Sequence, residues 1–266
     1  MRNIILSIGI LSMLAGMFVS CRSDDDEKKI VRKKENPQNT TQRSLSFSTY
    51  ETVGIDLETK QRDSIKQILY YDYDSEGRVV KIYDSNGYRE DFDYKSLAKI
   101  TLENGVETSI GKLNVDGSIA SDSALNGSYK KEYTYDENGY VKDYNSVFVV
   151  DEEDRSHYTY SYTWEDGNIV SCQVKDGGVH NGAAMELGVY DYQYEYTNET
   201  VTTPIENKTG MVFLFDNVMD FSYVFGKKCK NLPVAVNNQK IEWTLDGEGY
   251  PVKVVTNKAT ATFMWK

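Results

Sequence analysis

The chain has 266 residues, with 41 acidic and 30 basic side chains and a formal net charge of −11 at pH 7. Such an excess of negative charge repels nucleic-acid phosphates and anionic lipid headgroups, so we exclude nucleic acid as a partner. Its two histidines, His157 and His180, have no second His or Cys at ligand spacing. We therefore expect no metal site and no other cofactor.

Residues 1–20 read as a secretory signal peptide. A short start with Arg2 precedes an apolar run from Ile4 to Val19, which is interrupted by Ser and Gly and is too short for a transmembrane helix. The run ends at Ser20-Cys21, as the leaders of bacterial lipoproteins do. This similarity implies that the Cys21 thiol carries diacylglycerol and that several acyl chains anchor the protein in a membrane.

Residues 21–44 follow as a tag and a tether. Residues 28–43 are polar and charged with almost no apolar spacing, which predicts a flexible linker. An acidic block directly after the lipidated cysteine resembles the export tag of Bacteroidetes surface lipoproteins. We therefore expect an outer-membrane lipoprotein that faces the cell exterior, with the periplasmic face as the alternative. The block consists of Ser23, Asp24, Asp25, Asp26 and Glu27.

Residues 45–266 form one predicted domain, because no Pro- or Gly-rich break divides them. Two segments alternate aromatic and polar residues with a period of two, the pattern of half-buried strands. The aromatic residues on one face are candidates for binding a ligand, although most of them are expected to pair across strands and hold the sheet together. They are Tyr158, Tyr160, Tyr162 and Trp164 in the first segment and Tyr190, Tyr192, Tyr194 and Tyr196 in the second.

Turn sequences of the form Asp-x-x-Gly recur after Tyr-x-Tyr or Trp-x-Leu segments. They begin at Asp74, Asp136 and Asp246. Asp at the first position and Gly at the last suit a type I turn, which closes a hairpin between neighbouring strands. We predict an all-β fold: an antiparallel up-and-down meander in a strongly curved sheet or a partial or closed barrel. One short helix is expected at residues 215–223, with a buried strand as the alternative.

The hairpin motifs, the segment from Gly226 to Pro233 and the leader together resemble an uncharacterised family of Bacteroidetes lipoproteins with a porin-like fold. The resemblance covers roughly residues 70–266. It implies a curved or closed antiparallel sheet, and it transfers no functional residue except Cys21. The hairpin motif also occurs in the tyrosine–aspartate repeats of toxin shells. The charged residues between the tyrosines and the mean hydropathy of −0.56 argue against a barrel that spans a bilayer.

Cys172 and Cys229 remain after lipidation of Cys21. They could form a disulfide in an oxidising compartment or remain two thiols, and the sequence leaves both open. Carboxylates are plentiful, but no pair of them is singled out for catalysis, so we expect a protein that is not an enzyme.

The expected role is a non-catalytic binding module at the cell surface. A glycan is the favoured ligand, because tyrosine faces stack on sugar rings while Asp, Asn and Gln bond to hydroxyls. Two alternatives remain. A curved sheet can enclose a lipid or another apolar ligand, and a surface protein can act as a scaffold that docks a partner protein.

Overall fold

The computed structural model describes residues 43–55, 62–151, 154–209, 212–214, 218–220, 226–257 and 259–266. The predicted leader, Cys21 and the acidic block from Ser23 to Glu27 lie outside the described residues, as does nearly all of the tether. Among the described residues, no helix has the length and apolar character needed to cross a membrane.

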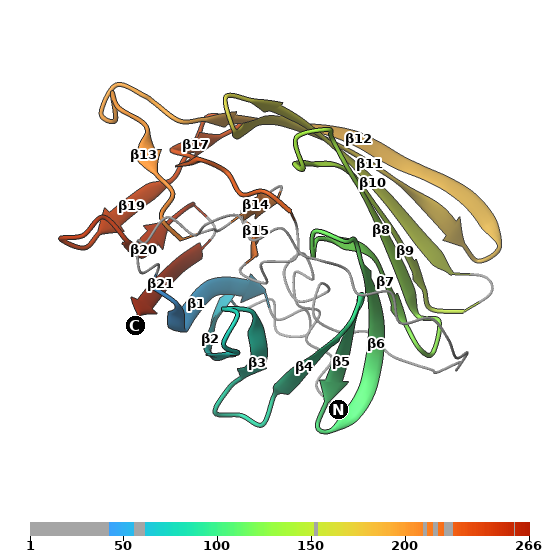
Figure 1. Ribbon diagram of the computed structural model, residues 1–266. Coiled ribbons are helices and arrows are strands. Elements are labelled where there is room, and N and C mark those ends of the chain that lie inside the picture. Colours follow the sequence, from blue (N-terminus) through green and yellow to red (C-terminus); the bar gives the residue numbers. More distant parts are fainter. Residues whose placement is uncertain are drawn as a thin grey trace.

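Seventeen strands form one antiparallel sheet that curls round on itself (Figure 1). From β1 to β12, each strand pairs with the next in the chain, as the Asp-x-x-Gly turns predict. The strands are β1 (Leu45–Ile55), β2 (Arg62–Tyr73), β3 (Val79–Tyr83), β4 (Arg89–Lys95), β5 (Ala98–Glu103), β6 (Val106–Leu113), β7 (Ile119–Ala124), β8 (Tyr129–Tyr135), β9 (Val141–Val149), β10 (Arg155–Glu165), β11 (Asn168–His180) and β12 (Ala183–Glu195).

Pairings between the two ends of the chain nearly close this sheet into a ring. The strands β19, β20 and β21 continue the meander, and β21 pairs with β1. On the other side, β12 pairs with β17 and β17 with β18, and only Ile241 separates β18 from β19 along the chain. The all-β, strongly curved architecture is therefore confirmed. These strands are β17 (Ala235–Val236), β18 (Gln239–Lys240), β19 (Glu242–Leu245), β20 (Pro251–Val255) and β21 (Ala259–Trp265).

Two small ladders lie outside the main sheet, and one of them corrects the predicted helix at residues 215–223. The strands β13 (Ile205–Glu206) and β16 (Asn231–Leu232) form the first ladder, and β14 (Val212–Leu214) and β15 (Val218–Asp220) form the second. The three described residues of the predicted helix are thus a strand, and the described residues contain no helix. A short apolar run has no intrinsic preference strong enough to resist pairing with a neighbouring strand.

The Asp-x-x-Gly turns have the geometry that their sequence predicts. At Asp74, Asp136 and Asp246, the carboxylate Oδ1 accepts hydrogen bonds of 2.9 Å from the backbone N–H groups two and four residues later. The glycine N–H three residues later donates to the aspartate carbonyl oxygen at 3.0–3.1 Å. The three glycines have φ values of 77°, 84° and 85°, which side chains rarely adopt.

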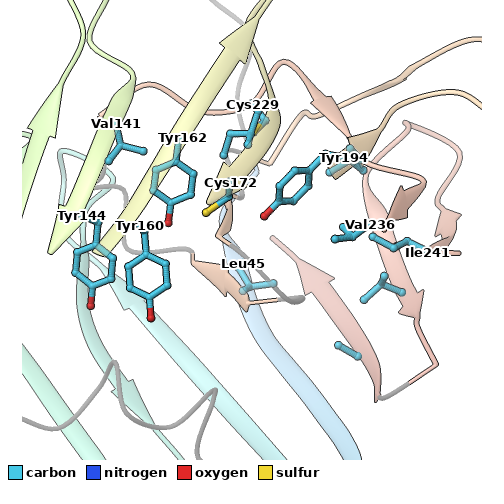
Figure 2. Packing of buried hydrophobic residues seen from close by; sticks show 14 of the residues in the cluster. Leu45, Val141, Tyr144, Tyr160, Tyr162, Cys172, Tyr194, Cys229, Val236 and Ile241 are labelled. Atoms are coloured by element: carbon cyan, nitrogen blue, oxygen red, sulfur yellow. The ribbon is translucent and has the colours of Figure 1, made fainter. Parts of the chain in front are cut away.

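The buried face of the sheet points into the ring and is rich in tyrosine (Figure 2). Tyr133, Tyr144 and Tyr160 occupy paired positions on β8, β9 and β10. Their rings stack in sequence, with centroid separations of 4.8 and 4.9 Å. The outer positions of these strands carry polar residues, including the ion pair between Lys130 and Glu132 at 2.7 Å. The aromatic residues therefore hold the curved sheet from within.

Residues 226–241 pack over one end of the strands β8 to β12. The backbone N–H groups of Lys227 and Lys230 donate to the carbonyl oxygens of Gly139 and Gly167, which lie in the β8–β9 and β10–β11 turns, at 3.0 and 2.8 Å. Within the segment, Leu232, Pro233 and Val234 are fully buried. We call this segment the end cap.

Candidate functional site

The predicted aromatic residues divide by exposure. Tyr190 is 48% exposed, whereas the other seven are buried or partly buried against the core. Two of the partly buried rings also bond to the backbone: the Trp164 Nε1–H donates to the Val141 carbonyl oxygen at 2.7 Å, and the Tyr196 hydroxyl donates to the Ile169 carbonyl oxygen at 2.9 Å. Most of these rings thus hold the sheet together. The fully buried ones are Tyr160, Tyr162 and Tyr194.

Cys172 and Cys229 are both buried and form no disulfide in the structure. In Figure 2 the hydroxyls of Tyr162 and Tyr194 point toward the Cys172 thiol. Burial raises the pKa of Cys172 to about 12, although the Tyr162 hydroxyl opposes this shift. The Cys172 thiol is therefore neutral at physiological pH and is a poor nucleophile.

A row of polar side chains interrupts the apolar inner face at β5 to β9. Lys99, Asp122, Lys131 and Ser146 are all buried, with Lys131 only 2% exposed. The strand register aligns them: Lys99 is opposite Gly111, which is opposite Asp122, and the row continues through Lys131 to Ser146. Residues directly opposite each other have Cβ atoms about 4.5–5.5 Å apart, so Asp122, Lys131 and Ser146 are immediate neighbours. We call these four residues the polar row.

Glu90 on β4 completes this cluster and is only 3% exposed. Burial raises the pKa of Glu90 to about 7, and the nearby Glu103 carboxylate adds to this increase. The Lys99 ammonium, the Tyr88 hydroxyl and the Lys131 ammonium act in the opposite direction and lower the pKa. The two lysines therefore do not fully compensate the cost of burying the Glu90 charge. We call Glu90 together with the polar row the inner polar site.

The ammonium groups of the inner polar site lie over aromatic rings. The Lys99 Nζ is 4.7 Å from the centre of the Phe92 ring, and the Lys131 Nζ is 4.6 Å from that of Tyr129. Among the described residues, neither Glu90 nor Asp122 makes an ion pair within 4 Å. Carboxylates are rarely buried without an ion pair, so the burial of Glu90 and Asp122 costs folding free energy.

Two oxygen atoms of the polar row lack a hydrogen-bond partner among the described residues. The Tyr129 hydroxyl donates to Asp122 Oδ2 at 3.3 Å, but Asp122 Oδ1 and Ser146 Oγ are buried and accept or donate nothing there. A buried polar atom without a partner costs roughly 1–3 kcal/mol. The polar row therefore contains two buried oxygen atoms whose hydrogen-bonding capacity the described residues do not use. Among the described residues, no group of three or more His, Cys, Asp or Glu is placed to hold a metal ion.

The sequence analysis did not identify the inner polar site, although a local signal for it exists. Lys131 lies between Tyr129 and Tyr133 in a period-two pattern, and Glu90 lies between Tyr88 and Phe92. A charged residue at a position that the alternation assigns to the buried face is the signal that would have identified both.

Comparison with solved structures relates the fold to porin-like proteins. The chain matches the crystal structure of a porin-like protein from Bacteroides uniformis with a TM-score of 0.57 and 14% identity, over 84% of this chain and 98% of that one. A porin-like protein from Bacteroides vulgatus gives a TM-score of 0.54 and 14% identity, over 84% and 99% of the two chains. The chain thus shares a porin-like fold, and at this identity the likeness extends to the fold alone.

Comparison with known sequences gives a narrower result. The tRNA nuclease WapA of Bacillus subtilis is 30% identical over 142 residues, which is 51% of this chain and 6% of WapA. The match therefore covers a small part of a much longer protein. No protein-family profile matches the chain.

Proposed function

We propose that this protein is a lipid-anchored surface protein of the outer membrane whose domain binds a glycan without catalysis. The observation that carries the proposal is the inner polar site, where buried charges and the unpartnered oxygens of Asp122 and Ser146 lie on an aromatic face. A sugar matches both features, because its hydroxyls bond to polar atoms while its apolar ring face packs on tyrosine.

The same observation argues against the apolar-ligand alternative. A lipid chain next to Glu90, Asp122 and Lys131 would desolvate their charges further and supply no hydrogen bond in return. A partner-docking scaffold is the remaining alternative. It predicts that the polar outer face, including the pair of Lys130 and Glu132, carries the function in place of the inner face.

The membrane anchor is the second part of the proposal and rests on Cys21. The described chain begins at Arg43, whose guanidinium pairs with Asp246 at 2.9 Å in the β19–β20 turn. Substitution of Cys21 by alanine should move the protein from the membrane to the soluble fraction. Protease treatment of intact cells should remove the domain. Retention of the variant in the membrane, or full protection from protease, would contradict the anchor or the surface location, respectively.

A glycan-binding screen tests the ligand class. The domain from residue 43 onward is applied to a panel of immobilised neutral and acidic saccharides, and each hit is measured by titration calorimetry. Asp122→Asn and Ser146→Ala should each weaken binding at least about tenfold, since the first replaces an acceptor oxygen with a donor and the second removes a hydroxyl from the polar row. The matched control is Ser161→Ala, because Ser161 is exposed and bonds Asp143 at 2.9 Å. If no saccharide binds, or if the control variant loses as much affinity as Ser146→Ala, the proposal is wrong.

A further inference from the structure

We propose that the solvent-exposed end of the inner face binds a small organic amine, whose ammonium group pairs with the Asp176 carboxylate and whose apolar body packs on Tyr190. The site lies on β10, β11 and β12, near the turn that joins β11 to β12 (Figure 1). It shares no residue with the inner polar site, and its ligand belongs to a different class. The proposal therefore does not depend on glycan binding.

The inner face opens to solvent toward the β11–β12 turn. Along β12, Tyr194, Tyr192 and Tyr190 lie on the same face, because every second residue of a strand does so. Tyr194 is 6% exposed, Tyr192 is partly buried and Tyr190 is 48% exposed. The same change occurs on β11, from Cys172, which is buried, to Asp176, which is partly exposed. A ligand can therefore reach this end of the inner face from solvent, and binding there needs no cavity inside the ring.

The strand register places Asp176 between two aromatic side chains. Asp176 is directly opposite Tyr158 on β10 and directly opposite Gly188 on β12. The Tyr190 ring lies over Gly188, since a Cβ added to this glycine would be 3.1 Å from Cζ and from the hydroxyl oxygen of Tyr190. Directly opposite residues have Cβ atoms about 4.5–5.5 Å apart. Asp176 therefore has the Tyr158 side chain on one side and the tip of the Tyr190 ring on the other.

The Asp176 carboxylate has no partner among the described residues. It takes part in no ion pair or hydrogen bond there, and its Oδ1 is a buried atom. On the same strands, Arg155 and Lys175 are exposed, and they occupy positions that alternate to the outer face. A buried carboxylate oxygen without a donor costs free energy. An ammonium group supplies both the missing hydrogen bond and the opposite charge.

The surroundings of Asp176 favour an organic amine over other ligands. Tyrosine rings attract an ammonium group through their quadrupole, and the exposed ring of Tyr190 offers an apolar surface to the rest of the ligand. A neutral sugar would donate a hydrogen bond but leave the charge of the carboxylate uncompensated. A metal ion needs several ligands, and among the described residues no group of three or more His, Cys, Asp or Glu is placed to supply them.

Titration calorimetry tests the proposal on the whole chain from Cys21 onward, purified in a non-ionic detergent. The three probes share one ring and differ in charge: cyclohexylammonium, cyclohexanol and cyclohexanecarboxylate. Cyclohexylammonium should bind at least about tenfold more tightly than cyclohexanol, because its hydrogen bond to a carboxylate is charge-assisted. Cyclohexanecarboxylate should not bind. Added salt should weaken the binding of cyclohexylammonium, because salt screens charges at a partly exposed site.

Substitutions locate the site. Asp176→Asn keeps the shape of the side chain and should weaken the binding of cyclohexylammonium at least about tenfold. Tyr190→Leu should weaken it about threefold, since it removes the exposed ring. The matched control is Asp191→Asn, because Asp191 is exposed on β12 and its carboxylate accepts a hydrogen bond from Gln173 at 3.0 Å. This control removes the same charge from the chain but leaves the Asp176 carboxylate in place.

The stability of the variants separates a loss of binding from a loss of folding. Asp176→Asn removes an unpaired carboxylate, so it should not lower the melting temperature. If cyclohexanol or cyclohexanecarboxylate binds as tightly as cyclohexylammonium, or if no probe binds, the proposal is wrong. It is also wrong if Asp191→Asn weakens binding as much as Asp176→Asn does. None of these outcomes changes the result of the saccharide screen, which concerns other residues.

Discussion

Replacement of Glu90 by glutamine should stabilise the folded protein at alkaline pH and leave its stability at pH 4 nearly unchanged. The physical reason is burial: the pKa of Glu90 rises from the ordinary 4.5 to about 7 in the folded state. Below pH 4.5 the carboxyl group is neutral in both the folded and the unfolded states and contributes no pH-dependent term. As the pH rises from 4.5 to 7, the unfolded state loses its proton first, and the folded state becomes less stable by comparison.

The size of the effect follows from the pKa shift. Each pKa unit corresponds to about 1.4 kcal/mol, so ionisation of Glu90 costs the folded state about 3 kcal/mol above pH 7. Glutamine has the same shape as the protonated acid and avoids this cost. For a domain of this size, about 3 kcal/mol corresponds to an increase of roughly 6–12 °C in melting temperature.

Urea unfolding followed by tryptophan fluorescence at pH 4, 6 and 8.5 measures the difference directly. The midpoint for Glu90→Gln should coincide with that of the wild type at pH 4 and exceed it increasingly at the two higher values. Glu137→Gln is the matched control, because Glu137 is exposed in the β8–β9 turn, and it should shift no midpoint appreciably. If Glu90→Gln is less stable than the wild type at pH 8.5, then an ion pair stabilises Glu90 and the reasoning is refuted.

Three further predictions concern the core and the end cap. Tyr144→Leu removes a ring that stacks on Tyr133 and Tyr160, and it should lower the free energy of unfolding, measured by urea titration, by about 1–3 kcal/mol. The control Tyr190→Leu, at an exposed position, should change the free energy of unfolding by less than about 0.5 kcal/mol. The Cys172 thiol should resist iodoacetamide at pH 8 in the folded protein and react in urea, as mass spectrometry of the alkylated chain will show; rapid reaction without urea would contradict its burial. Gly226→Ala should lower the melting temperature by several degrees, because Gly226 has a φ of 72° and an added Cβ would lie 2.7 Å from a backbone oxygen of the β8–β9 turn. An unchanged melting temperature would show that the end cap does not constrain this position.

The sequence determined the local structure of this protein. Alternation with a period of two selects strands, because it places every second side chain on one face, and Asp followed by Gly three residues later selects turns that join neighbouring strands. These two local rules are sufficient for the antiparallel meander from β1 to β12. They failed at residues 215–223, where a short apolar run satisfies a helix and a strand equally well and pairing with β14 decided for the strand.

Only the tertiary structure decided how the meander closes and which residues meet inside it. The pairing of β1 with β21 joins segments about 200 residues apart, and no local pattern encodes such a contact. The same closure turned Tyr160, Tyr162 and Tyr194 inward, where they pack the core and leave Tyr190 exposed.

The inner polar site likewise exists only in three dimensions. Lys99, Asp122, Lys131 and Ser146 come from four strands that the register aligns through Gly111. Glu90 comes from a fifth strand and lies near enough for Lys99 and Lys131 to lower its pKa. The sequence shows which residues share a face of each strand. Which of those faces becomes buried depends on closure of the whole sheet, because a side chain loses its contact with water only when distant strands enclose it.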